Sequence, residues 1–388
     1  MSTLVVTHVG ELTTNDPTLG DESPCGRLFD GAFVVDESQV LWVGPSNAAP
    51  AADEQLDVAG AAVVPGFVDS HTHLVFAGER SDEFEARMAG RRYDGGGITR
   101  TVLATRAATR EELSAGARQR ADELRAGGVT TFEVKSGYEL TSEGEVRCLE
   151  VAGELTNERT WLGAHVVPPE FTGNRDGYLD LLVTSMLEAC APHARWADVF
   201  CDRGAFSVDE ARTILTAAAA QGLAPRLHAN QLGHSGGVAL AVDLGCASVD
   251  HCTYLEDADI EMLAGSATVA TLLPGAEFST RSPYPSARRL LDAGATVALA
   301  TDCNPGSSYV TSMAFVLALA VREMNMSVDE ALWAATRGGA LALRRDDIGH
   351  LGVGARADFA ILDAPRAAHL AYRAGSRVVA ETRRGDLA

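Results

Sequence analysis

The chain has 388 residues, of which 46% are hydrophobic, as expected of a globular protein with one large domain or two to three ordinary ones. The formal net charge is −21 and the Lys and Arg residues form no basic stripe, which argues against nucleic-acid binding. No apolar run reaches the about 18 residues of a membrane span, the N-terminus lacks a signal-peptide pattern, and the seven cysteines stand singly, so a cytoplasmic protein is expected.

Both ends of the chain have the pattern of short strands. Residues 1 to about 62 contain the runs LVVTHVGEL, GAFVVD and VLWVGP, which turn residues separate. The tail from about residue 350 contains the similar runs GVGARADFAILD and SRVVAETRRG. Because chain termini often lie close together, residues 1–62 and 350–388 are predicted to form one small β-sandwich domain.

Residues 63–349 alternate short apolar runs with helical segments. Capping-box patterns mark helix starts at Thr109–Glu112, Ser207–Glu210 and Ser327–Glu330. The eight apolar runs are AVVPGFVDSH, VTTFEVKSG, TWLGAHVV, ADVFCDR, APRLHAN, CASVDHC, ATVATLLP and TVALATDC. Such runs are typical of buried parallel strands, and eight strand–helix units favour an α/β fold with a (β/α)8 TIM-type barrel over an open sheet.

Polar residues gather where the predicted strands end. The residues at the ends of the first, third, fifth, sixth and eighth runs are His71 with His73, His165, His228, His251 and Asp302. In a TIM barrel the active site lies at the C-terminal ends of the strands. These side chains are therefore predicted to surround one site.

The pair His71 and His73 points to a metal. Alternate residues of a strand face the same side, so two imidazoles spaced in this way can bind one ion. His228 would be the third nitrogen ligand and Asp302 the oxygen ligand, a set that suits catalytic Zn²⁺ or Fe²⁺. Taken alone, His228 also fits a buried core histidine, and Asp302 fits a turn residue before NPGSS.

Six motifs resemble those of a known enzyme family. HTHLVFAGER, EVKSGYEL, GAHVVP, HANQLG, DHCTYLE and ATDCNPGSS are similar to motifs of the amidohydrolase superfamily, and specifically of its imidazolonepropionase family. Enzymes of that family hydrolyse 4-imidazolone-5-propanoate to N-formimino-L-glutamate in histidine degradation, which breaks a C–N bond of a cyclic amidine. The resemblance covers nearly the whole chain, including both terminal segments.

The resemblance implies a role for each matching residue. The metal ligands would be His71, His73, His228 and Asp302, holding one divalent ion, zinc or iron, per subunit. Asp302 would also take a proton from the attacking water, and His251 would stabilise the oxyanion or assist proton transfer. The residues implied to bind substrate are Arg80, Tyr93, Tyr138, His165, Gln231, Asn304, Gly306 and Ser307.

Several of these residues have a plainer interpretation. Without the resemblance, Arg80 would be assigned to a surface salt bridge. Tyr93 and Tyr138 would be assigned to half-buried packing with a hydrated hydroxyl group. The resemblance instead implies that the guanidinium of Arg80 binds the propanoate carboxylate, to which its planar fork is suited.

Two positions refine the expected chemistry. Some family members have Glu where this chain has Gln231, and because an amide cannot accept a proton in this way, Gln231 is expected to anchor substrate. Some superfamily members bridge two metals with a carbamylated lysine at the end of the fourth strand. Lys135 ends the second run instead, so one metal is favoured.

Other functions remain as alternatives. A related deaminase or formiminoglutamate hydrolase would have the same ligands, but superfamily deaminases typically add a Glu near the fifth-strand histidine, where this chain has Asn230 and Gln231. An inactive barrel that only binds a ligand is the alternative without catalysis, and the intact ligand set argues against it. A homodimer acting on a small molecule, with no nucleic-acid or membrane partner, is expected.

Overall fold

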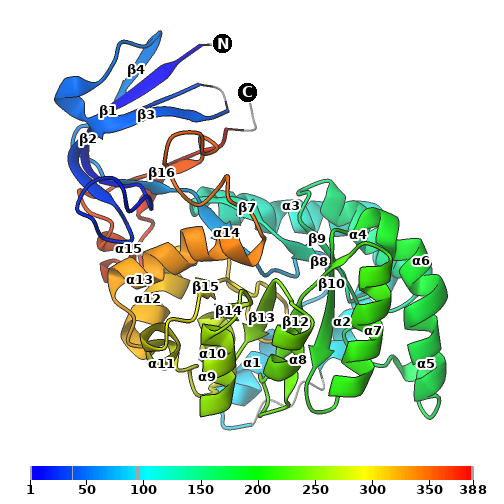
Figure 1. Cartoon of the computed structure of the whole chain (residues 1–388). Helices are drawn as coiled ribbons and strands as arrows, with labels where there is room; N and C mark the ends of the chain where they lie inside the picture. Colours follow the sequence, from blue (N-terminus) through cyan, green and yellow to red (C-terminus); the bar gives the residue numbers. More distant parts are fainter. Residues whose placement is uncertain (1, 37, 92–96, 386–388) are drawn as a thin grey trace. The chain divides into compact units, whose positions relative to one another are not determined.

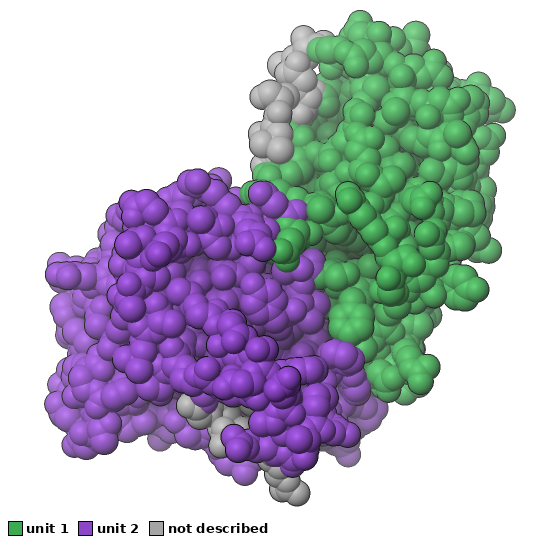
Figure 2. Space-filling view, turned by 180° about the vertical axis from the view of Figure 1, so that it is seen from behind, with its two compact units in different colours: residues 1–70, 123–131, 312–388 green, residues 71–122, 132–311 purple. Residues whose placement is uncertain are grey.

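The computed structural model describes residues 2–36, 38–91 and 97–385 (Figure 1). The chain forms two compact units, which Figure 2 colours separately: residues 1–70, 123–131 and 312–388 make unit 1, and residues 71–122 and 132–311 make unit 2. Within the described ranges, no helix has the length and apolar character needed to cross a membrane.

Unit 1 contains one seven-stranded sheet built from both ends of the chain. Its strands are β1 (Leu4–Thr13), β2 (Arg27–Val35), β3 (Val40–Pro45), β4 (Glu54–Asp57), β5 (Val63–Pro65), β16 (Phe359–Leu362) and β17 (Val379–Arg383). Strand β5 pairs with β1 and, antiparallel, with β16, which joins the two ends. Buried apolar side chains, among them Phe33 and Phe359 in edge-to-face contact, form the core. The predicted terminal strands are present, and their description as a sandwich stays a prediction.

The helices of the C-terminal part of unit 1 precede or interrupt the last strands. They are α12 (Met313–Glu323), α13 (Val328–Trp333), α14 (Gly339–Ala342) and α15 (His369–Tyr372). Helix α13 begins with the predicted capping box, since Ser327 and Glu330 exchange hydrogen bonds between side chain and backbone.

The first predicted barrel run divides in two. Residues 63–65 form β5 of the terminal sheet, whereas β6 (Phe67–Asp69) pairs with β7 (Val129–Phe132). The division falls at Gly66, where a Cβ atom would lie 2.2 Å from the Thr130 hydroxyl oxygen. Pro65 cannot donate a backbone hydrogen bond, so a continuous central strand is disfavoured there. Treating AVVPGFVDSH as one strand was therefore wrong.

Unit 2 is organised around a parallel sheet. Its strands, in chain order, are β8 (Val134–Lys135), β9 (Arg159–Ala164), β10 (Trp196–Cys201), β11 (Ala224–Pro225), β12 (Leu227–Ala229), β13 (Ser248–His251), β14 (Val269–Leu272) and β15 (Val297–Leu299). Strands β8 to β15 lie side by side in chain order, except that the short β11 pairs beside β10. Each predicted run from the second to the eighth contains one of these strands or a neighbouring pair.

Helices connect the strands and lie outside the sheet (Figure 1). They are α1 (Ser81–Met88), α2 (Ile98–Ala107), α3 (Arg110–Ala126), α4 (Ser142–Gly153), α5 (Arg175–Leu181), α6 (Leu187–Cys190), α7 (Val208–Ala220), α8 (Gly237–Asp243), α9 (Asp257–Ala264), α10 (Pro274–Thr280) and α11 (Ala287–Asp292). Reciprocal bonds between Ser207 and Glu210, and between Thr109 and Glu112, confirm the other two capping boxes.

The segment 71–73 links the two edges of the parallel sheet. Thr72 forms a parallel bridge with Cys303, just beyond β15, and the backbone of Lys135 in β8 donates a 2.9 Å hydrogen bond to the carbonyl of Thr72. The sheet is therefore curled, and the fold is an α/β barrel-like one. Because the strands are parallel, their C-terminal ends face one common centre.

Candidate metal centre and active site

Three of the predicted metal ligands are positioned as an ion would require. The Nε2 atoms of His71 and His73 lie 3.3 Å apart, and each is 3.5 Å from Oδ1 of Asp302. A tetrahedral zinc ion with bonds of about 2.0–2.1 Å holds its ligand atoms about 3.4 Å apart. These donor atoms already have that spacing.

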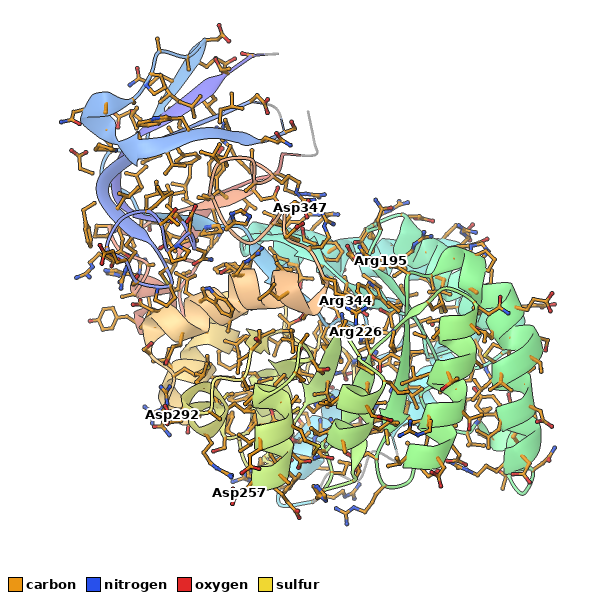
Figure 3. The ribbon with its side chains drawn as sticks, in the orientation of Figure 1. Arg195, Arg226, Asp257, Asp292, Arg344 and Asp347 are labelled. Carbon is orange, nitrogen blue, oxygen red and sulfur yellow. The ribbon has the colours of Figure 1, made fainter. Side chains whose placement is uncertain are left out.

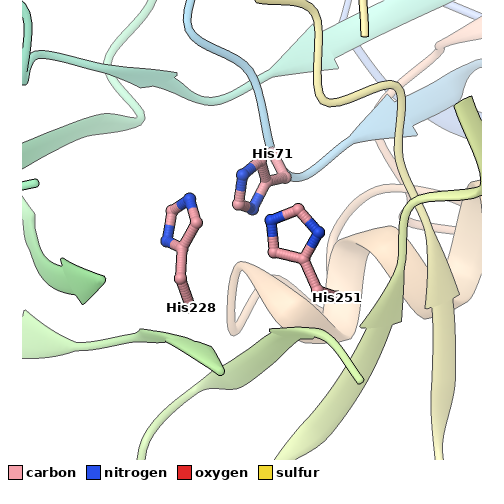
Figure 4. Close-up of side chains that lie close together, drawn as sticks. All are labelled: His71, His228 and His251. Carbon is pink, nitrogen blue, oxygen red and sulfur yellow. The ribbon is translucent and has the colours of Figure 1, made fainter. Parts of the chain in front are cut away.

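His228 and His251 complete a set of five side chains. One ring nitrogen of each lies within 4.8 Å of the other and of a nitrogen of His71, so the three imidazoles converge (Figure 4). The ring centroids of His71 and His228 are 4.5 Å apart. The geometry therefore brings together the four predicted ligands and the predicted catalytic histidine, and the division of roles among them stays a prediction.

Carboxylates behind the site orient two of the imidazoles. Nδ1 of His71 is 2.7 Å from Oδ2 of Asp250, and Nδ1 of His228 is 2.9 Å from Oδ2 of Asp198. A carboxylate on Nδ1 fixes the ring tautomer and leaves Nε2 as a metal ligand. Burial lowers the pKa of His71 and of His73 well below the usual range, so both rings are neutral, as metal binding requires.

The charge of the region also fits a divalent cation. Buried charged groups here are the carboxylates of Glu133, Asp198, Asp250 and Asp302 and the cations of Lys135 and Arg226. With these six groups ionised, two negative charges are left over. Burial raises the pKa of Asp302 well above its usual range, and a cation beside Oδ1 would keep this carboxyl group ionised. Donor atoms, spacing and charge thus all suit one divalent metal.

A pocket opens onto these side chains. The residues that line it are His73, Arg80, Ile98, Tyr138, His165, Val166, Phe200, His228, Gln231, His251, Asp302, Asn304, Gly306 and Ser307. All of the predicted substrate-binding residues that the structure describes are among them. Tyr93 lies outside the described residues. The sequence did not indicate the apolar wall of Ile98, Val166 and Phe200.

Arg80 is a buried pocket residue rather than part of a surface salt bridge. Its side chain is 5% exposed, and its Nε and one terminal nitrogen donate hydrogen bonds of 3.0 and 2.6 Å to the carboxylate of Glu83. A Cβ atom on Gly306 would lie 2.4 Å from the other terminal nitrogen, so a larger residue there would displace the guanidinium. Glu83 therefore holds the guanidinium by one edge, beside the loop that follows Asp302.

His165 and Tyr138 form one side of the pocket. Nδ1 of His165 is 2.9 Å from the carbonyl oxygen of Gly137, so Nδ1 carries the proton and Nε2 is an acceptor. Burial lowers the pKa of His165 to about 3, which keeps the ring neutral. Gly137 has φ of 106°, a conformation that favours glycine. The Tyr138 ring packs 5.3 Å from His165 between ring centroids.

The loop after Asp302 is a compact turn held by Asn304. The Asn304 side-chain oxygen accepts 2.8 Å hydrogen bonds from the backbone of Gly306 and of Ser307. Its amide nitrogen donates to the carbonyl of Asp302, and the Ser307 hydroxyl lies 3.4 Å from Oδ2 of Asp302. Residues 302–307 therefore form the turn that the sequence pattern predicted, and the hydrogen bonds of this turn also hold Asp302 in the site.

Gln231 lines the pocket, and a hydrogen bond to Asp202 holds its backbone in place. Its amide N–H donates a 2.7 Å hydrogen bond to Asp202, whose carboxylate also accepts from Leu232. The side chain can donate or accept a hydrogen bond, but it supplies no proton acceptor comparable to a carboxylate.

Sequence reasoning missed the buried charges behind the histidines. Asp198 lies in the run ADVF, and Asp250 directly precedes His251. Both are fully buried. A charged residue inside an apolar strand run is itself a signal, because such a group is almost never buried without a partner.

Glu277 is a buried acid beside the site that allows a stability test. Its Oε1 accepts a 2.6 Å hydrogen bond from Thr253, Oε2 has no partner among the described residues, and burial raises its pKa from 4.5 to about 7. The folded state thus binds this proton more tightly than the unfolded state. Stability should fall by about 3 kcal/mol as the pH rises from about 4.5 to 7, and stay level above.

Glu277→Gln should remove this part of the pH dependence. The free energy of unfolding, measured in urea at pH 5 and pH 8, should decline less with pH in the variant than in the unsubstituted protein. Glu261→Gln, an exposed position on α9, serves as the matched control and should leave the slope unchanged. An unchanged slope in Glu277→Gln would show that Glu277 is already ionised in the folded protein.

Comparison with known proteins identifies the family of the chain. The model of the amidohydrolase family matches residues 62–384. The imidazolonepropionase of Streptomyces griseus subsp. griseus is 61% identical over 98% of this chain and 97% of its own length. That of Mycolicibacterium smegmatis is 60% identical over 100% of this chain and 98% of its own length.

Solved structures share the fold. Atrazine chlorohydrolase from Arthrobacter aurescens has a TM-score of 0.71 at 19% identity, covering 98% of this chain and 94% of its own. The A. niger ochratoxinase has a TM-score of 0.71 at 20% identity, covering 99% and 94%. These two support the barrel-like fold alone. The family match and the full-length relatives show that this chain belongs to the imidazolonepropionase family of the amidohydrolases.

Proposed function

We propose that the protein hydrolyses 4-imidazolone-5-propanoate to N-formimino-L-glutamate, the step of histidine degradation that its relatives' name denotes. The observation that carries the proposal is one pocket that is lined both by three of the four proposed metal ligands (His73, His228 and Asp302) and by the buried side chain of Arg80. A ring carbonyl next to the metal and a carboxylate on the arginine match the two ends of this substrate.

The proposed cofactor is one divalent ion per subunit, zinc or iron, held by His71, His73, His228 and Asp302. When bound, such an ion polarises a water molecule and lowers its pKa toward neutrality. Oδ1 of Asp302 belongs to the donor set, while Oδ2, 3.4 Å from the Ser307 hydroxyl, is the oxygen proposed to take the proton of the attacking water.

His251 and the polar pocket residues handle the ring. His251 stabilises the oxygen that becomes negative as the ring carbonyl is attacked, or transfers the proton that the leaving nitrogen requires. Tyr138 helps Arg80 to hold the propanoate, and neutral His165 and Gln231 hold the ring by hydrogen bonds, since all four residues line the same pocket. The C–N bond then breaks, and the nitrogen leaves as part of the formimino group.

Replacing Arg80 by methionine should raise KM for the propanoate substrate about 10- to 100-fold, because one charge-assisted interaction with a carboxylate is lost. The metal content should not change. Arg100→Met is the matched control, since Arg100 also pairs with Glu83 but is half exposed and does not line the pocket. Steady-state kinetics give the answer, and equal KM values for Arg80→Met and the unsubstituted enzyme would exclude Arg80 as the carboxylate site.

The function itself is tested by the ultraviolet loss of freshly made imidazolonepropanoate, with and without a metal chelator. Guanine and formiminoglutamate, assayed alongside, represent the deaminase and formiminoglutamate hydrolase alternatives. Turnover of imidazolonepropanoate alone, abolished by the chelator, is the expected result. Turnover of either other compound, or of none by the metal-loaded protein, would overturn the proposal.

The proposal also includes the domain boundaries, the oligomeric state and the cellular location. Residues 63–349 would form a complete (β/α)8 barrel, and residues 1–62 with 350–388 a small β-sandwich domain; the family match over residues 62–384 supports the first boundary. A homodimer in the cytoplasm that acts on a small molecule is also proposed, and the acidic composition without a basic stripe supports the expectation that it has no nucleic-acid partner and, with no long apolar run, no membrane partner.

A further inference from the structure

A cluster of five buried charged residues lies behind the metal-binding histidines. They are Glu133, Lys135, Asp198, Arg226 and Asp250, each fully buried. Lys135, Asp198 and Asp250 lie in β8, β10 and β13 of the parallel sheet, and Glu133 and Arg226 directly precede β8 and β12. Figure 3 shows Arg226 among the strands, whereas Asp257 and Asp292 lie at the periphery. None of the five lines the pocket. They can therefore affect chemistry only through other residues.

Lys135 is the cation that connects the three carboxylates. Its Nζ lies 2.9 Å from Oε1 of Glu133, 2.9 Å from Oδ2 of Asp198 and 4.0 Å from Oδ2 of Asp250. The other cation, Arg226, is 3.4 Å from Oδ2 of Asp250. One ammonium group thus reaches carboxylates from three places in the sheet.

Each of these carboxylates holds a different part of the metal-binding set. Asp198 contacts His228 at two points: its Oδ1 accepts a 3.1 Å hydrogen bond from the backbone N–H, and its Oδ2 lies 2.9 Å from Nδ1. Asp250 lies 2.7 Å from Nδ1 of His71. Glu133 accepts a 3.1 Å hydrogen bond from the backbone of Thr72, the residue between His71 and His73. One carboxylate therefore separates Lys135 from His71 and from His228, and Glu133 separates it from the backbone between His71 and His73.

A carbamylated Lys135 does not fit this arrangement. Carbamylation would replace the positive charge by a negative one among three fully buried carboxylates. The two contacts of 2.9 Å are those of an ammonium group with its ion partners.

We propose that Lys135 is a positioning residue: its ammonium group fixes Glu133, Asp198 and Asp250, and through them directs the Nε2 atoms of His71 and His228 to the metal. Lys135 thereby sets metal affinity and coordination geometry without touching metal or substrate. The inference deepens the proposed function and rests on its metal site. Partners behind metal ligands commonly change metal affinity by about 10- to 100-fold.

The test uses the full chain and measures metal binding rather than turnover. Lys135→Met removes the charge but retains most of the side-chain length. Its dissociation constant for Zn²⁺, measured by competition with a chromogenic chelator, should rise about 10- to 100-fold. The visible absorption spectrum of the Co²⁺-loaded variant should differ from that of the unsubstituted protein, because the imidazoles are no longer held in one geometry.

Two further variants separate positioning from folding. Lys135→Arg keeps the charge, but its larger planar group cannot reproduce both 2.9 Å contacts in a filled interior, so its Co²⁺ spectrum should also change. Adding Glu133→Gln to Lys135→Met removes one negative charge as well, and should recover part of the Zn²⁺ affinity. Arg226→Met, which leaves the contacts of Asp198 intact, should have the smaller effect.

The results for these variants support or contradict the positioning role of Lys135. A folded Lys135→Met or Lys135→Arg protein with unchanged Zn²⁺ affinity and an unchanged Co²⁺ spectrum would overturn it. If Lys135→Met does not fold, Lys135→Arg and the double variant give the answer. The proposed reaction can fail separately, since weakened metal binding in these variants would stand even if imidazolonepropanoate were not the substrate.

Discussion

Asp302→Asn is expected to lower kcat by about four orders of magnitude or more. The substitution keeps the shape of the side chain but removes its negative charge and its capacity to accept a proton. Loss of a general base alone typically costs about 10²- to 10⁴-fold, and Asp302 is also one of the proposed metal ligands, at 3.5 Å from the Nε2 atoms of His71 and His73. Steady-state rates on imidazolonepropanoate, with metal content measured on the same samples, give the result.

A neighbouring variant provides the control for Asp302→Asn. Ser307→Ala removes the hydroxyl group 3.4 Å from Oδ2 but leaves the carboxylate, so its loss of kcat should be about tenfold at most. If Asp302→Asn keeps more than about a tenth of the activity when fully loaded with metal, Asp302 is not the proton acceptor.

His251→Ala should lower kcat by about 10²- to 10⁴-fold while the protein retains its metal. His251 would be a fifth protein donor beside three imidazoles and one carboxylate, and a catalytic site must keep a position open for water. His228→Ala should instead lose metal and turnover together, because its Nε2 is directed to the site by Asp198.

The comparison of His251→Ala with His228→Ala separates a catalytic group from a ligand. The distinction requires an experiment because His71, His228 and His251 each place a nitrogen within 4.8 Å of the others. Equal loss of metal and turnover in both variants would make His251 a ligand, and the oxyanion would then need another partner.

The backbone conformation of His251 and Asp302 gives a reason to expect that substituting their side chains changes activity more than folding. His251 and Asp302 have φ of 79° and 51°, in the left-handed region that non-glycine residues rarely adopt. Conformations of this kind persist where surrounding structure holds them, and they are frequent at functional sites. Substituting the side chain while leaving the backbone contacts should therefore change chemistry more than fold.

The sequence by itself determined the set of strands and the composition of the site. All eight apolar runs contain strands, because buried parallel strands require continuous apolar residues, although the first, second and fifth runs each divide into two strands. The convergence of His71, His73, His228 and Asp302 followed from their positions at strand ends, since parallel strands that curl together bring those ends to one centre. The motif resemblance added the substrate and the role of Arg80.

Only the tertiary structure decided which polar groups are partners. Arg80 is buried against Glu83 and Gly306, Lys135 is an ammonium among three carboxylates, and the first run divides at Gly66. Each of these features depends on contacts that the strand pattern does not predict. Strand periodicity indicates the face of the sheet on which a residue lies, but not which side chains it contacts there. Burial then decides the chemistry, because a charge removed from water must find an opposite charge or a metal.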